Sequence, residues 1–192
     1  MDTINLKKNL RKDISHRKNT IPFDKKCLFS NTILNKLEQL DNFSSAHTIL
    51  IYHALPDEVQ TVDFLNKWYI NKRIVLPLVK PNFQLILKEY NPKNIQVGYK
   101  NIPEPTSDAT TINAEDIDLA VIPGVGFDSK CNRMGRGKGF YDRLIPRLNC
   151  PLIGLAYDLQ IVDDIPVDKF DKKMDKVLTE KREFIKKVLK KK

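Results

Sequence analysis

The spacing of apolar and polar residues along the chain predicts helices and strands that alternate. In residues 3–18, Leu6, Leu10 and Ile14 recur at every fourth position among lysines and arginines, which is the pattern of an amphipathic helix. The same reasoning predicts further helices over 24–40, 61–71, 138–148 and 181–191. Short apolar runs predict strands over 48–52, 73–79, 84–90, 118–122, 152–157 and 177–179. Four Pro and Gly residues predict a loop over 91–108.

Strands that alternate with helices favour an α/β fold with a mostly parallel central sheet. The chain has 192 residues and neither an internal repeat nor a Gly/Ser linker, so we expect a single domain over 1–192. Ligands of such sheets bind at the carboxyl ends of the strands. A site is therefore expected in the loops that follow Tyr52, Ile122 and Ala156.

Composition and charge argue against several classes of protein. No apolar run approaches the roughly 18 residues that a membrane span needs, and residues 1–18 lack the apolar core of a secretion signal. We therefore expect a cytoplasmic protein without a membrane contact. The net charge is +9, but residues 1–18 sum to +4 and residues 181–192 to +6, which leaves about −1 for the rest. This distribution does not indicate a basic stripe for nucleic acid across the fold.

The loop after the strand at 118–122 has the strongest chemical signal. Three of the seven glycines, Gly135, Gly137 and Gly139, fall within five residues and alternate with cations. Glycine lets backbone N–H groups approach an anion, and arginine forks match phosphate oxygens. The spacing fits neither GxxxxGK[ST] nor GxGxxG. A polyphosphate site, a loop that binds the RNA backbone and a solvated turn are the three alternatives.

Acidic residues favour the polyphosphate alternative. Asp142 lies one helical turn after Lys138, and Mg²⁺ is usually held by one or two carboxylates together with phosphates. A second acidic cluster, around Asp171, cannot be placed near Asp142 from spacing alone. The segment from His53 to Glu58 follows a buried strand. A carboxylate there accepts N–H donors of a heterocycle, acts as a base, or caps the next helix.

Four segments, in this order, resemble the 5-formyltetrahydrofolate cyclo-ligase family. They are Leu55-Pro-Asp-Glu-Val59 with Thr61, Ile102-Pro-Glu-Pro105, Pro123-Gly-Val-Gly-Phe-Asp128 and Arg133-Met-Gly-Arg-Gly-Lys-Gly-Phe-Tyr-Asp142. The similarity runs from Lys7 to about Glu180. It implies a three-layer α/β/α fold and conversion of 5-formyltetrahydrofolate and ATP to 5,10-methenyltetrahydrofolate, ADP and phosphate, with Mg²⁺. We expect a monomer whose partner is this small molecule.

The resemblance also implies a role for each matching residue. Lys7 and Arg11 would reach ATP, and Asp142 and Asp171 would bind Mg²⁺. Residues that would wrap the phosphates are Arg133, Gly135, Arg136, Gly137, Lys138, Gly139, Phe140 and Tyr141. Of these, Arg136, Gly137, Lys138, Gly139 and Phe140 would also touch the folate, and Arg136 and Lys138 would stabilise the transferring phosphoryl group. His53, Leu55 and Glu58 would form the pterin pocket.

The chain departs from the family pattern at three positions. Phe140 stands where many members have Tyr, so a hydroxyl there is not essential. Val79 and Lys100 replace aromatic residues that line the folate pocket in some members. Two other functions remain alternatives: an RNA-backbone binder, and an ATP-dependent kinase or ligase that acts on another small molecule.

Overall fold

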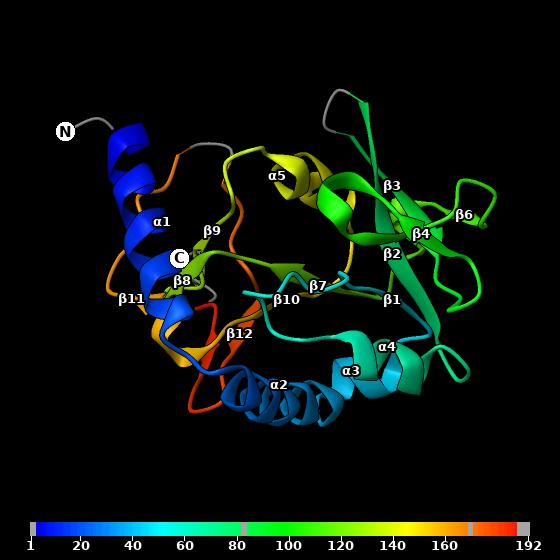
Figure 1. The fold of residues 1–192 in the computed structure, drawn as a ribbon, viewed down its shortest axis with the longest axis horizontal. Helices are drawn as coiled ribbons and strands as arrows, with labels where there is room; N and C mark the ends of the chain where they lie inside the picture. Colours follow the sequence, from blue (N-terminus) through cyan, green and yellow to red (C-terminus); the bar gives the residue numbers. More distant parts are fainter. Residues whose placement is uncertain (1–2, 82–83, 169–170, 188–192) are drawn as a thin grey trace, which may run out of the picture.

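The computed structural model describes residues 3–81, 84–168 and 171–187. Its central sheet has eight strands in the order β13-β12-β10-β7-β1-β2-β3-β6 (Figure 1). The five middle strands are all parallel: β12 (Lys176–Leu178), β10 (Leu152–Leu155), β7 (Leu119–Pro123), β1 (Thr48–Leu50) and β2 (Arg73–Lys80). Antiparallel strands complete the edges: β13 (Glu183–Ile185) on one side, β3 (Gln84–Glu89) and β6 (Thr111–Ile112) on the other. The mostly parallel sheet is confirmed.

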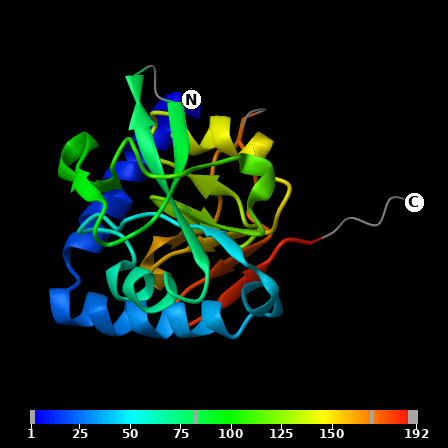
Figure 2. The same cartoon turned by 90° about the vertical axis from the view of Figure 1, so that its right-hand side faces the viewer.

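The sheet separates two hydrophobic cores, because successive side chains of a strand point to opposite faces. Ile49 of β1 packs with residues of α2 (Phe23–Glu38), α3 (Asp41–Ser45) and α4 (Val62–Trp68). Its neighbour Leu50 packs with Leu144 and Ile145, which belong to α5 (Phe140–Leu144) and the 3₁₀ turn η4 (Ile145–Arg147). Figure 2 shows α2 running along one side of the sheet and α5 on the opposite side. This arrangement confirms the three-layer α/β/α fold.

The N-terminal helix α1 (Thr3–Asn19) packs against a second, smaller sheet. That sheet consists of β11 (Ile161–Val162), β8 (Gly126–Asp128) and β9 (Arg133–Met134). Ile14 is fully buried there with Val125 and Met134. A Cβ atom at Gly126 would lie 2.5 Å from the Cδ1 atom of Ile14, so a larger residue there would force Ile14 to shift. Residues 133–142, in which glycines alternate with cations, form the glycine-arginine segment. Because β9 begins this segment, α1 lies beside it (Figure 1).

The structure differs from the predicted elements in the middle of the chain. The predicted helix over 24–40 ends at Glu38, and α3 follows as a separate short helix. The predicted loop over 91–108 contains the antiparallel pair β4 (Ile95–Val97) and β5 (Pro103–Pro105), joined by the 3₁₀ turn η2 (Tyr99–Asn101). Prolines are tolerated in this pair because edge strands can leave an N–H position unpaired. Two further 3₁₀ turns are η3 (Ala114–Asp116) and η5 (Asp158–Gln160).

Two predicted helices near the end of the chain are shorter or absent. In the predicted helix over 138–148, α5 ends at Leu144 and η4 continues it, because Pro146 has no N–H for the α-helical ladder. The helix predicted over 181–191 is wrong within its described part. Residues Glu183–Ile185 form β13 instead, paired antiparallel with β12, and the partly buried Phe184 packs against the core. Residues 188–192 lie outside the described part.

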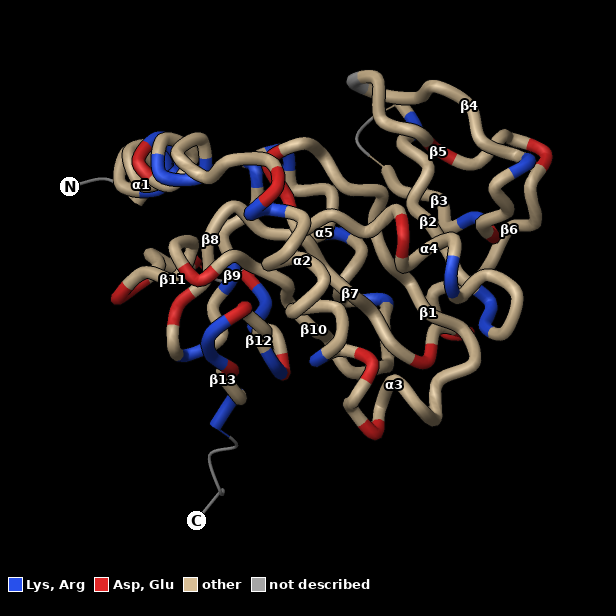
Figure 3. The backbone as a smooth tube through the Cα atoms, turned by 60° about the horizontal axis from the view of Figure 1, so that its bottom comes forward, with Lys and Arg blue, Asp and Glu red and all other residues tan. Residues whose placement is uncertain are grey.

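Charged residues are spread over the molecule. In Figure 3, lysines and arginines mark short stretches of many elements, including α1 and the end of β13, and acidic residues lie between them. Within the described residues, no helix has the length and apolar character needed to cross a membrane.

Candidate functional site

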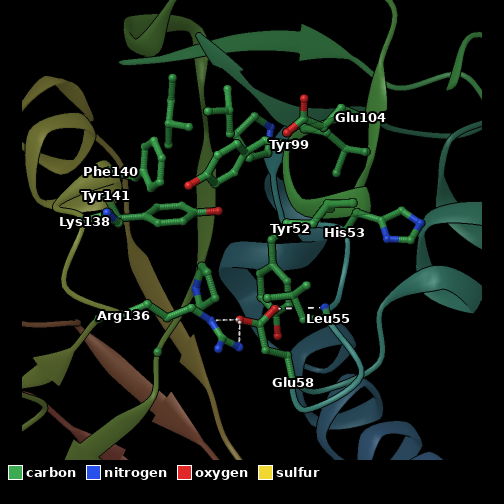
Figure 4. A pocket seen from close by; sticks show the side chains of 18 of the residues that line it. Tyr52, His53, Leu55, Glu58, Tyr99, Glu104, Arg136, Lys138, Phe140 and Tyr141 are labelled. Carbon is green, nitrogen blue, oxygen red and sulfur yellow. Dashed lines mark hydrogen bonds and ion pairs between the residues drawn. The ribbon is translucent and has the colours of Figure 1, made fainter. Parts of the chain in front are cut away.

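A pocket opens at the carboxyl ends of β1 and β7, where a site was expected. Residues that follow these strands, His53 and Gly124 among them, form part of its wall. The rest comes from β2, β3, η2, β5 and the segment from β9 to α5. The empty space is about 980 Å³ with the open mouth included, at the upper end of the roughly 300–1,000 Å³ of ligand pockets. Figure 4 shows Glu58 and Arg136 at one end and Tyr99 and Glu104 at the other.

Most of the predicted site residues line this pocket. They are His53, Leu55, Glu58, Arg133, Gly135, Arg136, Lys138, Gly139, Phe140, Tyr141 and Asp142. The predicted residues Lys7, Arg11, Gly137 and Asp171 are not part of the lining. Val79 lines the pocket, whereas the side chain of Lys100 lies outside the described part.

One end of the pocket is apolar. It is formed by aliphatic side chains and two aromatic rings, Leu76, Pro77, Val79, Leu85, Ile102, Tyr99 and Phe140. The rings of Tyr99 and Phe140 meet edge to face, with their centroids 6.0 Å apart. His53 is at the wall with a buried Nδ1 atom that has no hydrogen-bond partner among the described residues. Burial lowers the pKa of His53. This end suits a flat, largely apolar ligand.

The glycine-arginine segment has a backbone shape that two of its glycines make possible. Gly137 has a φ of +93° and Gly139 a φ of +68°, in the region that side chains disfavour. Arg11 of α1 donates from Nε to the carbonyl oxygen of Gly135 at 2.8 Å, and Arg143 donates to that of Lys138 at 3.0 Å. In a planar trans peptide, the N–H of the next residue points in the direction opposite to the carbonyl oxygen. The N–H of Arg136 therefore points away from Arg11. Arg11 therefore positions this segment from outside the pocket.

Arg133 is the most buried cation of the segment and holds it in place. Its side chain is 3% exposed. The guanidinium donates to the carbonyl oxygen of Pro123 at 2.9 Å and to Oδ1 of Asp142 at 2.5 Å, and it lies 5.8 Å from the ring centroid of Tyr141. These contacts join the end of β7 to the start of α5.

Glu58 pairs with Arg136 and does not cap a helix. Oε1 of Glu58 accepts from Nη2 of Arg136 at 2.9 Å and from its Nε at 3.2 Å, and Oε2 accepts the N–H of Leu55 at 3.1 Å. Burial on its own lowers the pKa of Arg136, but Glu58 and Asp57 raise it above its ordinary value. The next helix, α4, has Thr61 at its N-cap without a side-chain cap, so the capping alternative is wrong.

The backbone of Glu58 is fixed by the loop after β10. The hydroxyl of Tyr157 donates to the carbonyl oxygen of Glu58 at 2.8 Å, and Nε2 of Gln60 donates to the same oxygen at 2.6 Å. Burial raises the pKa of Tyr157 to about 12, so its hydroxyl remains a donor near neutral pH. The loop after Ala156 thus supports the site without lining the pocket.

Glu104 is a pocket residue that the sequence reasoning did not assign to the site. It is only 4% exposed, and its carboxylate accepts hydrogen bonds from the backbone of Tyr99 and Val79. Burial raises its pKa despite these bonds. A Cβ atom at Gly98 would collide with this carboxylate. A charged residue between two prolines was the available signal, but a loop prediction for 91–108 gave no reason to bury it.

The two acids expected to bind a metal both act on Arg11. Burial lowers the pKa of Arg11, and the charges of Asp142 and Asp171 act in the opposite direction. Oδ2 of Asp171 accepts from Nζ of Lys7 at 2.5 Å, and Lys7 also reaches Asp168 at 3.0 Å. Ion pairs beside the pocket thus join α1 to a segment near the other end of the chain.

The residues present fit a metal ion that arrives with a nucleotide. Among the described residues, no group of three or more His, Cys, Asp or Glu side chains could hold a metal without other ligands. Mg²⁺ at phosphates needs only one or two carboxylates, the remaining ligands being phosphate oxygens and water. Asp142 lines the pocket with a side chain 30% exposed, so it suits this type of coordination.

Comparisons with known proteins point to one family. The model of the 5-formyltetrahydrofolate cyclo-ligase family matches residues 3–180. The 5-formyltetrahydrofolate cyclo-ligase of Mus musculus is 27% identical over 91% of this chain and 93% of its own length. The Escherichia coli K12 enzyme of that name is 29% identical over 70% of this chain and 78% of its own.

A solved structure has the same fold. The NMR structure of Aquifex aeolicus 5,10-methenyltetrahydrofolate synthetase superposes with a TM-score of 0.88 at 29% identity, over 97% of this chain and 95% of that one. The family match covers far more than half of the chain. The chain therefore belongs to the 5-formyltetrahydrofolate cyclo-ligase family.

Proposed function

We propose that the protein converts 5-formyltetrahydrofolate to 5,10-methenyltetrahydrofolate at the expense of ATP, with release of ADP and phosphate. The observation that carries this proposal is the position of Arg136. Its guanidinium contacts Glu58 inside a pocket that is also lined by the apolar end and by the glycine-arginine segment. A folate and a polyphosphate would therefore meet at one side chain. The names of the relatives support the conversion of this folate.

Different residues of the pocket would bind the pterin, the rest of the folate and the nucleotide phosphates. Glu58 is the carboxylate that would accept N–H donors of the pterin, while the cleft beside Phe140 would take the rest of the folate. Arg136 and Lys138 would hold the transferring phosphoryl group, assisted by the amides of Gly137 and Gly139. Lys7 and Arg11 would contact the nucleotide from α1.

The chemistry needs no nucleophile from the protein. A formamide oxygen is a poor leaving group, so the formyl oxygen first attacks the γ-phosphorus and ADP departs. The secondary amine at position 10 of the folate then attacks the activated formyl carbon and loses its proton. Phosphate leaves with the former formyl oxygen as the ring closes. Arg136 and Lys138 would stabilise the charge on the transferring group, which accounts for cations in this segment.

Mg²⁺, held by Asp142 and the nucleotide phosphates, would neutralise phosphate charge. Asp171 is the second acid proposed for the metal, and its bond with Lys7 would change on binding. The apolar wall at Tyr99 and Phe140 would keep water from the activated intermediate.

Absorbance spectroscopy tests this function. Purified protein with 5-formyltetrahydrofolate and Mg-ATP should form the methenyl chromophore together with one ADP for each product molecule. Absence of the chromophore with folded protein at high concentration would refute the assignment. ADP release with other small molecules, but not with this folate, would favour a kinase or ligase of different specificity.

A further inference from the structure

Four charged side chains, linked by ion pairs, connect α1 to the glycine-arginine segment. Nζ of Lys18 lies 2.6 Å from Oδ2 of Asp57, and Oδ1 of Asp57 lies 2.6 Å from Nη2 of Arg136. The same Nη2 atom lies 2.9 Å from Oε1 of Glu58. Figure 4 shows Arg136 reaching across to Glu58, with dashed lines for their bonds. The four formal charges cancel.

Lys18 and Asp57 are not among the residues that line the pocket. The side chain of Lys18 is 1% exposed, and burial lowers its pKa although Asp57 opposes the shift. Burial alone would raise the pKa of Asp57, but Lys18 and Arg136 bring it below its ordinary value. A buried ammonium that lost its carboxylate would be strongly destabilised, so Lys18 depends on Asp57 as its counter-ion.

Arg136 therefore has two carboxylate partners that differ in their own surroundings. Glu58 has Arg136 as its only ion-pair partner among the described residues, whereas Asp57 divides its attraction between Arg136 and Lys18. On the proposed function, the folate would engage Glu58 and the nucleotide would need the guanidinium of Arg136. Asp57 is then the carboxylate that competes with phosphate for this guanidinium. Its electrostatic attraction for Arg136 is weaker while Lys18 is present.

We propose that Lys18 is a positioning residue for nucleotide binding: by neutralising Asp57, it allows Arg136 to exchange a carboxylate for a phosphate. This inference rests on the proposed function, since it takes nucleotide phosphate as the partner that Arg136 gains. Lys18 acts through Asp57 and does not touch the substrate. Its effect is on the availability of Arg136.

Substitutions at Lys18 and Asp57 test this role. Lys18→Met removes the ammonium but keeps an apolar stem of similar length, and Lys18→Arg keeps a positive charge. Asp57→Asn removes the charge that competes for Arg136. Lys12→Met is the matched control, because Lys12 is an exposed lysine on the same helix. For each variant, steady-state kinetics would give KM for Mg-ATP and for the folate, calorimetry the affinity for Mg-ATP, and thermal melting the stability.

Lys18→Met should raise KM and Kd for Mg-ATP by about tenfold, with KM for the folate changed by less than about twofold. Lys18→Arg should retain wild-type nucleotide affinity. Asp57→Asn should lower KM for Mg-ATP by about threefold and, combined with Lys18→Met, should bring it back to the wild-type range. A lysine that only stabilised the fold would lower the melting temperature without separating the two KM values.

Three results would overturn the role of Lys18. They are an unchanged affinity for Mg-ATP in folded Lys18→Met, an Asp57→Asn variant with weakened nucleotide binding, or a double variant as impaired as Lys18→Met alone. If either single variant does not fold because the remaining charge of the Lys18–Asp57 pair has lost its partner, the double variant, which removes both charges, decides by itself. Wild-type affinity for Mg-ATP in the double variant supports the role, and an affinity about tenfold weaker overturns it. Wild-type protein that makes no methenyl product would refute the proposed function, which is a separate outcome from an active enzyme that ignores Lys18.

Discussion

Removing the guanidinium of Arg136 should affect turnover more than stability. In Arg136→Ala, Glu58 keeps the N–H of Leu55 and Asp57 keeps Lys18, so neither carboxylate is left without a partner. The side chain of Arg136 is 41% exposed but that of Glu58 is only 10% exposed, so losing this pair should cost more than an exposed ion pair, which contributes about 0–1 kcal/mol. A loss of about 2 kcal/mol lowers the melting temperature of a chain this size by about 4–8 °C.

The expected loss of turnover is larger in free energy. Losing a main stabiliser of transition-state charge lowers kcat by about 100- to 1,000-fold, or about 2.7–4 kcal/mol. The initial rate of methenyl formation at saturating Mg-ATP and folate measures this loss, and a thermal melt of the same preparation measures the stability. Lys130→Ala is a matched control, because Lys130 is an exposed cation that pairs with Asp164 outside the pocket.

The reasoning fails if Arg136→Ala keeps kcat within about threefold of the wild type while it remains folded, since another group would then stabilise the charge of the transition state. It also fails if the Lys130→Ala control loses turnover to the same degree. In that case the loss would reflect net charge rather than the position of Arg136.

Three further predictions concern the apolar end, the glycine segment and the metal. Glu104→Ala should leave two backbone N–H groups without an acceptor, at a cost of about 1–3 kcal/mol each in urea unfolding, whereas Glu104→Gln retains an acceptor. The folded-state pKa of Glu104 is raised, so its contribution to stability is full below its ordinary 4.5 and declines as pH rises through the folded value. The stability of the wild type relative to Glu104→Gln should therefore fall as the pH rises from 4.5 towards neutrality. Gly137→Ala should cost about 1–2 kcal/mol through its φ of +93°, with no clash since the nearest atom is 3.6 Å away, and calorimetry should show weaker Mg-ATP binding. Asp142→Asn should raise the Mg²⁺ concentration for half-maximal activity by about tenfold, measured by titration.

Each of these three predictions has a result that would contradict it. Equal stability of the Ala and Gln variants at position 104 would mean that the carboxylate does not hold Tyr99 and Val79. Wild-type stability and nucleotide affinity in Gly137→Ala would show that the segment tolerates another backbone shape. An unchanged Mg²⁺ requirement in Asp142→Asn would exclude that carboxylate as a ligand.

Local pattern in the sequence was sufficient for the inner strands of the central sheet and for the residue types that line the pocket. Apolar runs at 48–52 and 118–122 identified two central strands, because strands buried on both faces are apolar throughout. The alternation of glycines with cations over 133–142 identified the segment at the pocket mouth. Such signals are local, since they depend on the backbone freedom and charge of neighbouring residues.

The helices and strands that were predicted wrongly or missed are those whose conformation depends on pairing with another segment of the chain. Residues 183–185 have a helix-compatible composition, yet β12 offers them an open sheet edge, and pairing there outweighs propensity. Pro103 and Pro105 suggested a loop, but β4 pairs with them and Glu104 between them is buried.

Only the tertiary structure decided which charges meet. Arg136 and Glu58 are 78 positions apart, and Lys7 and Asp171 are 164 apart, so no spacing rule relates them. The sequence predicted a segment suited to phosphate and a carboxylate suited to a heterocycle. The parallel sheet brings the ends of β1 and β7 together, and that contact makes the two into one site, because side-chain electrostatics acts over ångströms in space and not over positions in the chain.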